Sequence, residues 1–296
     1  MTNLAICIVT LNARDHIISC LDSIFAKTRV DIDIVVVDNH STDGTVDLIR
    51  ARFPMVKLIV NDDNYGFSRA VNQGLKILDA RYYILLNPDV VVIEDALDRL
   101  VAFMDENPRA GICTPRVFNG NGTMQYQCRR GEARPWDVFS YFLGLSRLFP
   151  KDPRFTGYLM THLDDNQVNE VKAVSGGSMM IRREVIEQIG YLDERYFAYQ
   201  EDTDYCFQAR KAGWKVYYIP EARMIHYGGR GGSKERPYFG IYQWHRSYYL
   251  YYRKNLAKDY PFWFHPIYYF AMACKLAVNM IMVFFSRDKV VGTRKP

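Results

Sequence analysis

The feature that most constrains the fold of this chain is a regular alternation of apolar runs and helical patterns over its first 115 residues. Each apolar run is short and rich in Ile and Val, and apolar residues recur at helical spacing between the runs. Apolar strands separated by helices are typical of a parallel sheet that is covered on both faces. We therefore predict strands at 4–10, 33–38, 56–60, 82–86 and 111–114, with helices at 15–25, 43–53, 67–78 and 94–104.

Polar motifs follow these strands, at the edge where sheets of this kind bind ligands. The first motif begins with Asp38 and Asn39 and leads into the helix at 43–53. The Asp38 carboxylate is suited to accept hydrogen bonds from a nucleobase or a ribose. The alternative is an ordinary strand–turn–helix connection in which the same residues cap the helix.

Two further motifs follow the third and fourth strands. Asn64 precedes a helix whose first turn carries Arg69, and free N–H groups at a helix start favour anions such as phosphate. The run from Asn87 to Asp89 delivers a carboxylate to a turn, and Mg²⁺ takes one or two carboxylates together with substrate phosphates. Either motif is also compatible with a plain turn that has no ligand.

Three carboxylates, Glu201, Asp202 and Asp204, crowd the start of a predicted helix at 202–212. Acidic residues stabilise helix starts, so capping explains part of the pattern. Like charges at close range nevertheless cost free energy unless a metal, a catalytic role or a cation offsets them. We predict that Asp202 is a general base, that Glu201 orients the acceptor, and that Asp204 pairs with Arg210 or Lys211.

A glycine-rich loop follows His226 and contains Arg230 and Ser233. Glycines of this density form loops that bind anions through backbone N–H groups. We predict that His226 ligates a metal and that Arg230 and Ser233 contact a pyrophosphate. The alternative for the histidine is a satisfied packing residue.

The motifs occur in one order along residues 4–235: Asp-Asn-x-Ser-x-Asp-Gly-Thr, Asn-x-Gly-Phe-x-x-Ala-x-Asn, Leu-Asn-Pro-Asp, Gly-Gly-Ser-Met-Met-Ile-Arg-Arg, Gly-Tyr-Leu-Asp-Glu-x-Tyr-Phe, Glu-Asp-x-Asp and His-x-Gly-Gly. This order resembles the family 2 inverting glycosyltransferases, and most of all their bacterial rhamnosyltransferase-like branch. The resemblance implies an α/β GT-A fold, with a mostly parallel, Rossmann-like sheet and helices on both faces. It implies a catalytic domain at 1–235, with a nucleotide-binding half at 1–115 and an acceptor-binding half at 116–235, followed by membrane-associating helices at 236–296.

The resemblance also implies roles for single residues. Asp89 matches the metal-binding aspartate of the family's Asp-x-Asp element, in which this chain has Asn87 at the first position. His226 matches a histidine that completes metal or diphosphate binding, and Asp202, with Glu201 beside it, matches the catalytic base. The implied cofactor is Mg²⁺ or Mn²⁺. The implied donor-binding residues are Thr10, Asn12, Asp38, Asn39, Asn64, Arg69, Asn87 and Arg230.

The reaction implied by the resemblance is a single displacement that inverts the configuration of the transferred sugar. The donor is a nucleotide-diphosphosugar; the branch favours dTDP-rhamnose, and UDP-sugars and GDP-mannose remain open. The acceptor is a hydroxyl of a lipid-linked or polysaccharide glycan, in the synthesis of a bacterial cell-surface glycan.

The tail is basic and aromatic, and it contains an apolar run at 261–285. The run is long enough to cross a bilayer, but Lys275 in its middle would be costly at the bilayer centre. An interfacial helix, a core or oligomer-contact helix and a spanning helix all remain open. Residues 230–296 hold twelve Lys/Arg and three Asp/Glu, a composition that suits binding to an anionic membrane surface. A second copy of the chain, in a homo-oligomer, is a further expected partner.

The expected location is the cytoplasm, with the protein peripheral at the inner face of the plasma membrane. The six cysteines are scattered, which favours buried, reduced thiols, and no secretory signal pattern precedes the first strand.

Two functions of other classes are compatible with parts of the sequence. One is a catalytically decayed scaffold that still binds nucleotide-sugars; retention of Asp89, Glu201 and Asp202 argues against it. The other is a single-stranded nucleic-acid-binding protein that uses the aromatic tail as a stacking platform. The apolar run at 261–285 fits lipid better than a polynucleotide, so we predict no nucleic-acid partner.

Overall fold

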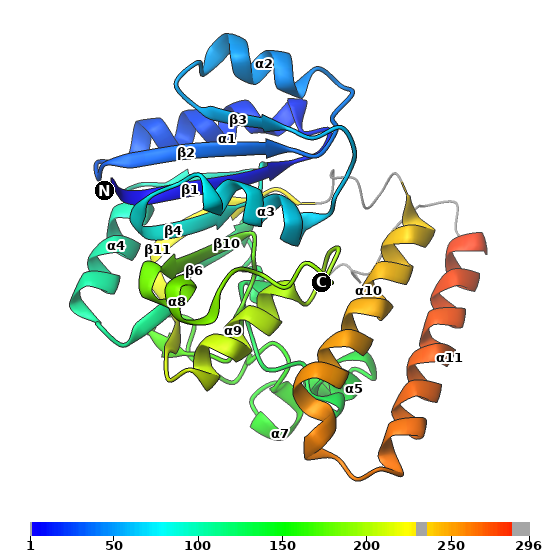
Figure 1. The fold of residues 1–296 in the computed structure, drawn as a ribbon. Coiled ribbons are helices and arrows are strands. Elements are labelled where there is room, and N and C mark those ends of the chain that lie inside the picture. Colours follow the sequence, from blue (N-terminus) through cyan, green and yellow to red (C-terminus); the bar gives the residue numbers. More distant parts are fainter. Residues whose placement is uncertain (1, 229–235, 286–296) are drawn as a thin grey trace.

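The computed structural model describes residues 2–228 and 236–285, and it is built around one nine-stranded sheet (Figure 1). The strand order is β3-β2-β1-β4-β10-β6-β11-β5, and β8 pairs with β11 beside this path. The strands of this sheet are β1 (Thr2–Thr10), β2 (Ile32–Asp38), β3 (Lys57–Val60), β4 (Ala80–Leu86), β5 (Val90–Ile93), β6 (Ala110–Asn119), β8 (Asn169–Glu170), β10 (Ser178–Arg182) and β11 (Lys215–His226).

Helices cover both faces of the sheet, as predicted. Side chains alternate along β1, so that Leu4, Ile6 and Ile8 enter one hydrophobic cluster while Ala5 and Cys7 enter the other. The first cluster is closed by α1 (Arg14–Lys27), α2 (Thr45–Arg52) and α4 (Ala96–Glu106). The second is closed by α3 (Phe67–Lys76), α8 (Arg183–Ile189) and α9 (Glu201–Lys211).

The parallel half of the sheet determines where the polar motifs lie. Strands β3, β2, β1 and β4 are mutually parallel, with Thr10 opposite Asp38 and Ile8 opposite Leu86. Their carboxyl ends therefore meet at one edge. Beyond β4 the sheet is mixed: β10 is antiparallel to β4 and β6, whereas β11 is parallel to β6. The carboxyl end of β11 consequently reaches the same edge as that of β4.

Two features of the sheet differ from the sequence expectation. Strand β5 was not predicted, because its four residues follow the turn at Asp89 directly and no break separates them from the helix expected at 94–104. Strand β6 is longer than the predicted strand at 111–114, and β11 continues to His226 after a register shift between Ile219 and Arg223. The shift lies next to Pro220, which lacks the N–H that a regular ladder requires.

The segment between β6 and β10 packs against the sheet. It contains η1 (Tyr126–Cys128), β7 (Arg129–Arg130), α5 (Pro135–Phe142), α6 (Leu145–Leu148), α7 (Pro153–Thr156) and β9 (Ala173–Val174). The same segment also contains β8 and a long-range ion pair. That pair joins the Asp165 carboxylate to the fully buried Arg129, a contact that local periodicity cannot reveal.

The tail is helical, as expected. It forms α10 (Pro237–Tyr251), the turns η2 (Tyr252–Leu256) and η3 (Ala257–Asp259), and α11 (Phe264–Phe285). Helices α10 and α11 lie side by side at the right of Figure 1, and the rings of Tyr249 and Tyr269 are 5.2 Å apart between centroids. A third hydrophobic cluster joins Tyr248 and Tyr251 to Tyr196 and Val138, so the tail is packed against the preceding part of the chain. All six cysteines are free thiols, and only Cys274 on α11 is exposed.

Candidate active site

The buried carboxylate of Asp38 lies at the carboxyl end of β2 and is fully enclosed by donors. Its Oδ2 accepts hydrogen bonds from the hydroxyls of Thr10 (2.8 Å) and Ser41 (2.5 Å), and its Oδ1 accepts one from the Ser41 N–H (2.8 Å). Asn12, with φ of 50°, joins the same turn because its Oδ1 accepts from the Thr42 N–H at 2.9 Å. Hydrogen bonds therefore connect the end of β1, with Thr10 and Asn12, to the turn after β2, with Asp38 and Ser41.

A second set of polar contacts joins the ends of β2 and β3. The buried Asn39 donates from its amide to the Gly66 carbonyl at 3.1 Å, and Asn64 accepts from the Gly66 N–H at 3.0 Å. Gly66 has φ of +82°, and a Cβ there would come within 2.5 Å of the Phe197 carbonyl oxygen, so only glycine fits. Arg69 is exposed, and its guanidinium lies 4.0 Å from the centroid of the Tyr65 ring.

Asp89 and His226 are brought together by the antiparallel pairing of β5 with β11. His226 Nε2 lies 3.1 Å from Asp89 Oδ1 and 3.3 Å from the Asn87 amide, and its Nδ1 lies 2.9 Å from Gln125 Oε1. Burial alone would raise the pKa of Asp89, but the hydrogen bond from His226 and the nearby charge outweigh it and lower that pKa. The pair thus offers an ionised carboxylate and an oriented imidazole.

A chain of contacts leads from this pair to the acidic start of α9. The Asn87 N–H donates to the Gly177 carbonyl at 3.1 Å, and a Cβ on Gly177 would lie within 2.8 Å of the Asn87 amide nitrogen. The next link is the Gly176 N–H, which donates to Asp202 Oδ2 at 3.0 Å. The two glycines therefore let the Asp89 turn and Asp202 approach each other across the end of β10.

The Asp202 carboxylate is buried and carries four donors. Arg130 Nη2 is 2.6 Å from its Oδ2, and the N–H and hydroxyl of Thr203 reach its Oδ1 at 2.6 and 3.1 Å. The fourth donor is the Gly176 N–H. Arg130 is itself almost fully enclosed; burial would lower its pKa, but the Asp202 charge outweighs that effect and raises it. The two side chains therefore form a buried ion pair.

Glu201 beside it is in a contrasting environment. Burial, followed by the neighbouring Asp202 charge, raises the pKa of Glu201 to about 8. Its Oε2 has no hydrogen-bond partner in the described structure, and neither has Oε1 of Gln200. Tyr199 and Gln200 both adopt left-handed backbone conformations, with φ of 69° and 64°. Strained backbone and unpaired buried oxygens together are typical of functional sites rather than of simple helix caps.

One predicted pairing is wrong. Asp204 contacts neither Arg210 nor Lys211; it accepts from Lys254 and Asn255 of η2, each at 2.7 Å. Arg210 instead pairs with Glu132. The sequence separation of about 50 residues hides the observed contact, whereas helical spacing suggested the local one.

Several residues at this edge were not singled out from the sequence. They are Arg130, Gln125, Thr203, Lys254 and Asn255, and only Arg130, as part of a double arginine after a polar stretch, carried any local signal. Arg230 and Ser233 lie outside the described residues, so their predicted contacts stay predictions.

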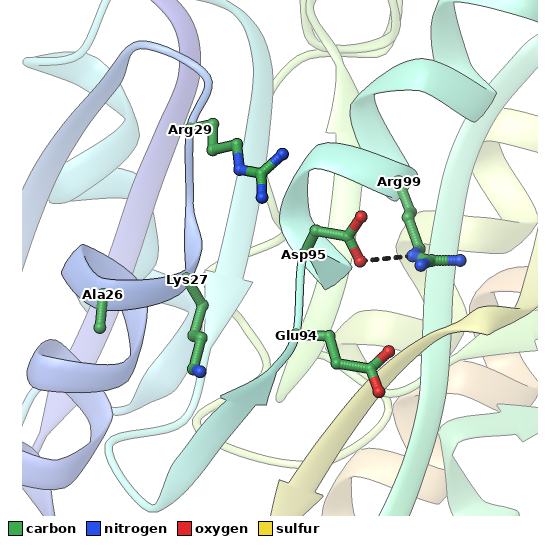
Figure 2. Close-up of a pocket in the computed structure, with 6 residues that line it drawn as sticks. All are labelled: Ala26, Lys27, Arg29, Glu94, Asp95 and Arg99. Carbon is green, nitrogen blue, oxygen red and sulfur yellow. Dashed lines mark hydrogen bonds and ion pairs between the residues drawn. The ribbon is translucent and has the colours of Figure 1, made fainter.

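A shallow hollow elsewhere on the molecule does not belong to this site (Figure 2). It lies between the end of α1 and the start of α4, at the edge where β2 begins, and Asp95 and Arg99 form an ion pair within it. The strand ends that carry the polar motifs face the opposite edge. Its lining residues are Ala26, Lys27, Arg29, Glu94, Asp95 and Arg99.

Known proteins resemble this chain in both sequence and fold. The pattern of glycosyl transferase family 2 matches residues 5–190. N-acetylglucosaminyl-diphospho-decaprenol L-rhamnosyltransferase of Mycobacterium tuberculosis is 29% identical over 254 residues, which cover 82% of this chain and 81% of that protein. Rhamnosyltransferase WbbL of Escherichia coli K12 is 26% identical over 191 residues, covering 61% of this chain and 67% of that protein.

Two solved structures share the fold at low sequence identity. S. aureus TarS superimposes with a TM-score of 0.54 at 16% identity, covering 81% of this chain but only 38% of the TarS chain. GalNAc-T7, solved with UDP, GalNAc and Mn²⁺, gives a TM-score of 0.56 at 17% identity, covering 76% of this chain and 43% of that one. Since the family pattern covers more than half of the sequence, the chain belongs to glycosyl transferase family 2: it is a glycosyltransferase of GT-A fold that resembles the rhamnosyltransferases.

Proposed function

We propose that this enzyme is a metal-dependent inverting transferase that moves L-rhamnose from dTDP-rhamnose to a hydroxyl of a lipid-linked glycan, in bacterial cell-surface glycan synthesis. The observation that carries the proposal is the contact chain from Asp89 and His226 through Asn87 and the two glycines to Asp202. This chain of contacts links Asp89 and His226, which suit a cation-bound diphosphate, to Asp202, which suits proton transfer. The names of two relatives, both rhamnosyltransferases, support the choice of sugar.

The donor nucleotide would be held at the ends of β1 and β2. Asp38, Thr10 and Asn12 line the connected turn there, and a hydroxyl of Thr10 or Ser41 can rotate away to expose a carboxylate lone pair to a base or ribose. Asn39 and Asn64 fix the neighbouring turn. Arg69, exposed at the start of α3, would contact the diphosphate, and Arg230 keeps the same predicted role.

The residues at the ends of β4 and β11 fit a divalent cation. Asp89 Oδ1 and His226 Nε2 are hard or borderline ligands 3.1 Å apart, and Gln125 holds the other imidazole nitrogen in the manner of an outer-shell partner. No cluster of three or more His, Cys, Asp or Glu side chains occurs in residues 2–228 and 236–285, so the remaining ligands would be diphosphate oxygens and water. Bound Mg²⁺ or Mn²⁺ would stabilise the negative charge that develops on the leaving diphosphate.

Asp202 would act as the general base. The acceptor oxygen forms a bond to the anomeric carbon, the bond from that carbon to the diphosphate oxygen breaks, and the hydroxyl proton passes to Asp202. One displacement inverts the configuration. Arg130 and the Gly176 N–H hold Oδ2 of the carboxylate in place, and rotation of the Thr203 hydroxyl frees a lone pair on Oδ1. Glu201, neutral at pH 7 because of its raised pKa, would donate a hydrogen bond to the acceptor sugar.

The proposed acceptor and the apolar tail helix both support a location at a membrane. A polyprenol-linked acceptor is confined to a bilayer, and α11 is long and apolar enough to enter one. We propose a cytoplasmic, peripheral protein at the inner face of the plasma membrane, with an anionic lipid surface as partner. The division into a domain at 1–235 and a module at 236–296 remains part of this proposal.

A donor panel tests the proposal directly. The purified enzyme is incubated with dTDP-rhamnose, UDP-sugars or GDP-mannose and a sugar linked to a short-chain prenyl diphosphate as acceptor, with Mg²⁺, with Mn²⁺ or with EDTA. We expect transfer from dTDP-rhamnose and its loss in EDTA, followed by recovery when metal is restored. Transfer only from another nucleotide-sugar would refute the donor assignment, and full activity in EDTA would refute the metal assignment.

A further inference from the structure

Lys275, the single Lys, Arg, Asp or Glu of helix α11, lies on the face of the helix that packs against the protein. The Lys275 ammonium lies inward, 3.9 Å from the centroid of the Trp244 ring of α10 and 4.3 Å from that of Phe142 of α5. The opposite face carries exposed apolar residues such as Phe270, which is 73% exposed. The charge that makes a bilayer location costly therefore points at the protein, where aromatic faces stabilise it.

A second exposed apolar surface lies on α5 and α6, in a segment to which the catalytic proposal gives no role. Phe142 connects it to the tail, because its ring also lies 5.9 Å from that of Trp244. Exposed Arg147 and Lys151 border it. Apolar side chains this exposed, in sequence neighbours, mark an interaction surface rather than scattered surface residues. They are Trp136 (50% exposed), Phe139 (52%), Leu143 (60%), Leu148 (71%) and Phe149 (48%).

We infer that the outward face of α11 and the exposed face of α5–α6 form one surface that docks onto an anionic bilayer. We call this the docking surface. Charge argues for this occupant, because the exposed Arg147 and Lys151 border the surface, and residues 236–285 hold six Lys/Arg against one Asp/Glu even though Lys254 and Lys275 face the protein. The aromatic composition of α5 also suits the headgroup zone, where Trp residues with one polar and one apolar end are enriched.

The contacts of α10 indicate that α11 lies in the plane of the membrane. Arg246 of α10 donates to the Arg195 carbonyl at 2.6 Å, and Ser247 donates to the Ala198 carbonyl at 2.7 Å. A spanning α11 would draw α10 and these backbone groups toward the hydrocarbon, at a cost of several unsatisfied polar groups. An interfacial helix buries only its apolar face and leaves the contacts intact.

The docking surface also explains how the base reaches a lipid-linked sugar. Helix α5 begins at Pro135, five residues after Arg130, the partner of Asp202. Docking would hold this part of the acceptor half against the headgroups. This step rests on the proposed lipid-linked acceptor, whereas the docking itself can be measured without any acceptor.

Vesicle partitioning of the full chain tests the inference. Three double variants are compared with wild type on phosphatidylcholine vesicles with and without phosphatidylglycerol: F139S/L143S on α5, F270S/I281S on α11, and a control, M55S/I77S, at exposed positions of the nucleotide-binding half. We expect wild type and the control to bind anionic vesicles and lose affinity at high salt. Each docking-surface variant should bind about tenfold more weakly or worse, the effect of removing one or two buried apolar side chains.

Failure of the docking inference can be distinguished from failure of the proposed sugar transfer. Transfer to a water-soluble, short-chain acceptor is measured in parallel and should be unchanged in all three variants, which also shows that they fold. Normal vesicle binding by F139S/L143S would overturn the inclusion of α5–α6. If wild type binds no vesicles but sediments as a dimer, and the docking-surface variants sediment as monomers, the surface binds a second copy of the chain. That result would overturn the inference.

Cys274 provides a test of depth, since it is the one exposed thiol and lies near the middle of α11. A fluorophore attached there should be quenched more by nitroxides near the lipid headgroups than by nitroxides at the ends of the acyl chains. Stronger quenching by the deep nitroxides would show that the helix spans the bilayer, and would overturn the in-plane arrangement.

Discussion

At the residue scale, the central interaction is the buried ion pair of Arg130 and Asp202. The Arg130 guanidinium lies 2.6 Å from the Asp202 carboxylate, so it fixes the orientation of the proposed base. The same pair is expensive to break, because removal of one partner leaves an uncompensated charge in the interior. It therefore links the stability of the acceptor half to its chemistry.

A double-mutant cycle measures this link. Arg130→Met should lower the free energy of unfolding by about 3–5 kcal/mol, and the double variant R130M/D202N should lose much less than the sum of the single losses. Urea denaturation provides the values. Arg134→Met is the control, because that pair with Glu132 is partly exposed and is expected to contribute under about 1 kcal/mol. Additive losses at Arg130 and Asp202 would show that the two side chains are not coupled.

Glu201, next to Asp202, is held in its neutral form, because burial and the Asp202 charge raise its pKa. Its pKa is about 8 in the folded chain against an ordinary value of 4.5. Between these two pH values the folded state retains a proton that the unfolded state has released, so stability falls as the pH rises through this window.

The pH dependence of Glu201→Gln tests the assignment. The amide has no proton to lose, so the variant should lose less stability than wild type between pH 5 and pH 8.5, and its melting temperature at the higher pH should exceed that of wild type. Differential scanning fluorimetry across this range measures both curves. Parallel curves for the two proteins would mean that Glu201 is ionised in the folded state throughout.

At the scale of elements, the start of α9 and the segment before it are held between α3 and the tail. On one side the Phe67 N–H of α3 donates to the Phe197 carbonyl at 2.7 Å. On the other side Lys254 of η2 bridges Asp193 and Asp204, at 2.8 and 2.7 Å. The tail helices therefore position the helix that carries the proposed base, in addition to any role at the membrane.

Lys254→Met should reveal this positioning role. We expect kcat to fall by about tenfold or more, because small displacements of a catalytic group are costly, while the Kd of dTDP stays within about twofold. Steady-state kinetics and calorimetry measure the two quantities. The matched control is the neighbouring Arg253→Met, because Arg253 contacts the ring and hydroxyl of Tyr249, within the tail itself. Equal kinetics for both variants would contradict the role of Lys254.

The elements also show what could be predicted from the sequence. The strands β1, β2 and β4 were predictable because each is a continuous apolar run, and a parallel sheet then fixes the common edge at which Asp38 and Asp89 lie. Strand β5 and the partners of Asp202 and Asp204 were not predictable from the sequence. They depend on contacts such as Arg130 to Asp202, over 72 residues of separation, and no local pattern encodes the register of β10 and β11 that creates them.

At the scale of the whole molecule, a nine-stranded sheet collects residues from every part of the sequence at one edge. Thr10 and Asp202 are almost 200 residues apart along the chain, yet Thr10 ends β1 and Asp202, at the start of α9, is bonded to the Gly176 N–H just before β10. The GT-A fold of the neighbours and the family 2 pattern account for this arrangement.

The most direct test of the account is the single-turnover rate of Asp202→Asn with bound dTDP-rhamnose and acceptor. The account predicts that the rate of sugar transfer falls by about 10²–10⁴-fold, while calorimetry gives a wild-type Kd for dTDP in the presence of Mg²⁺ or Mn²⁺. A wild-type transfer rate in this variant would contradict the assignment of Asp202 as the base.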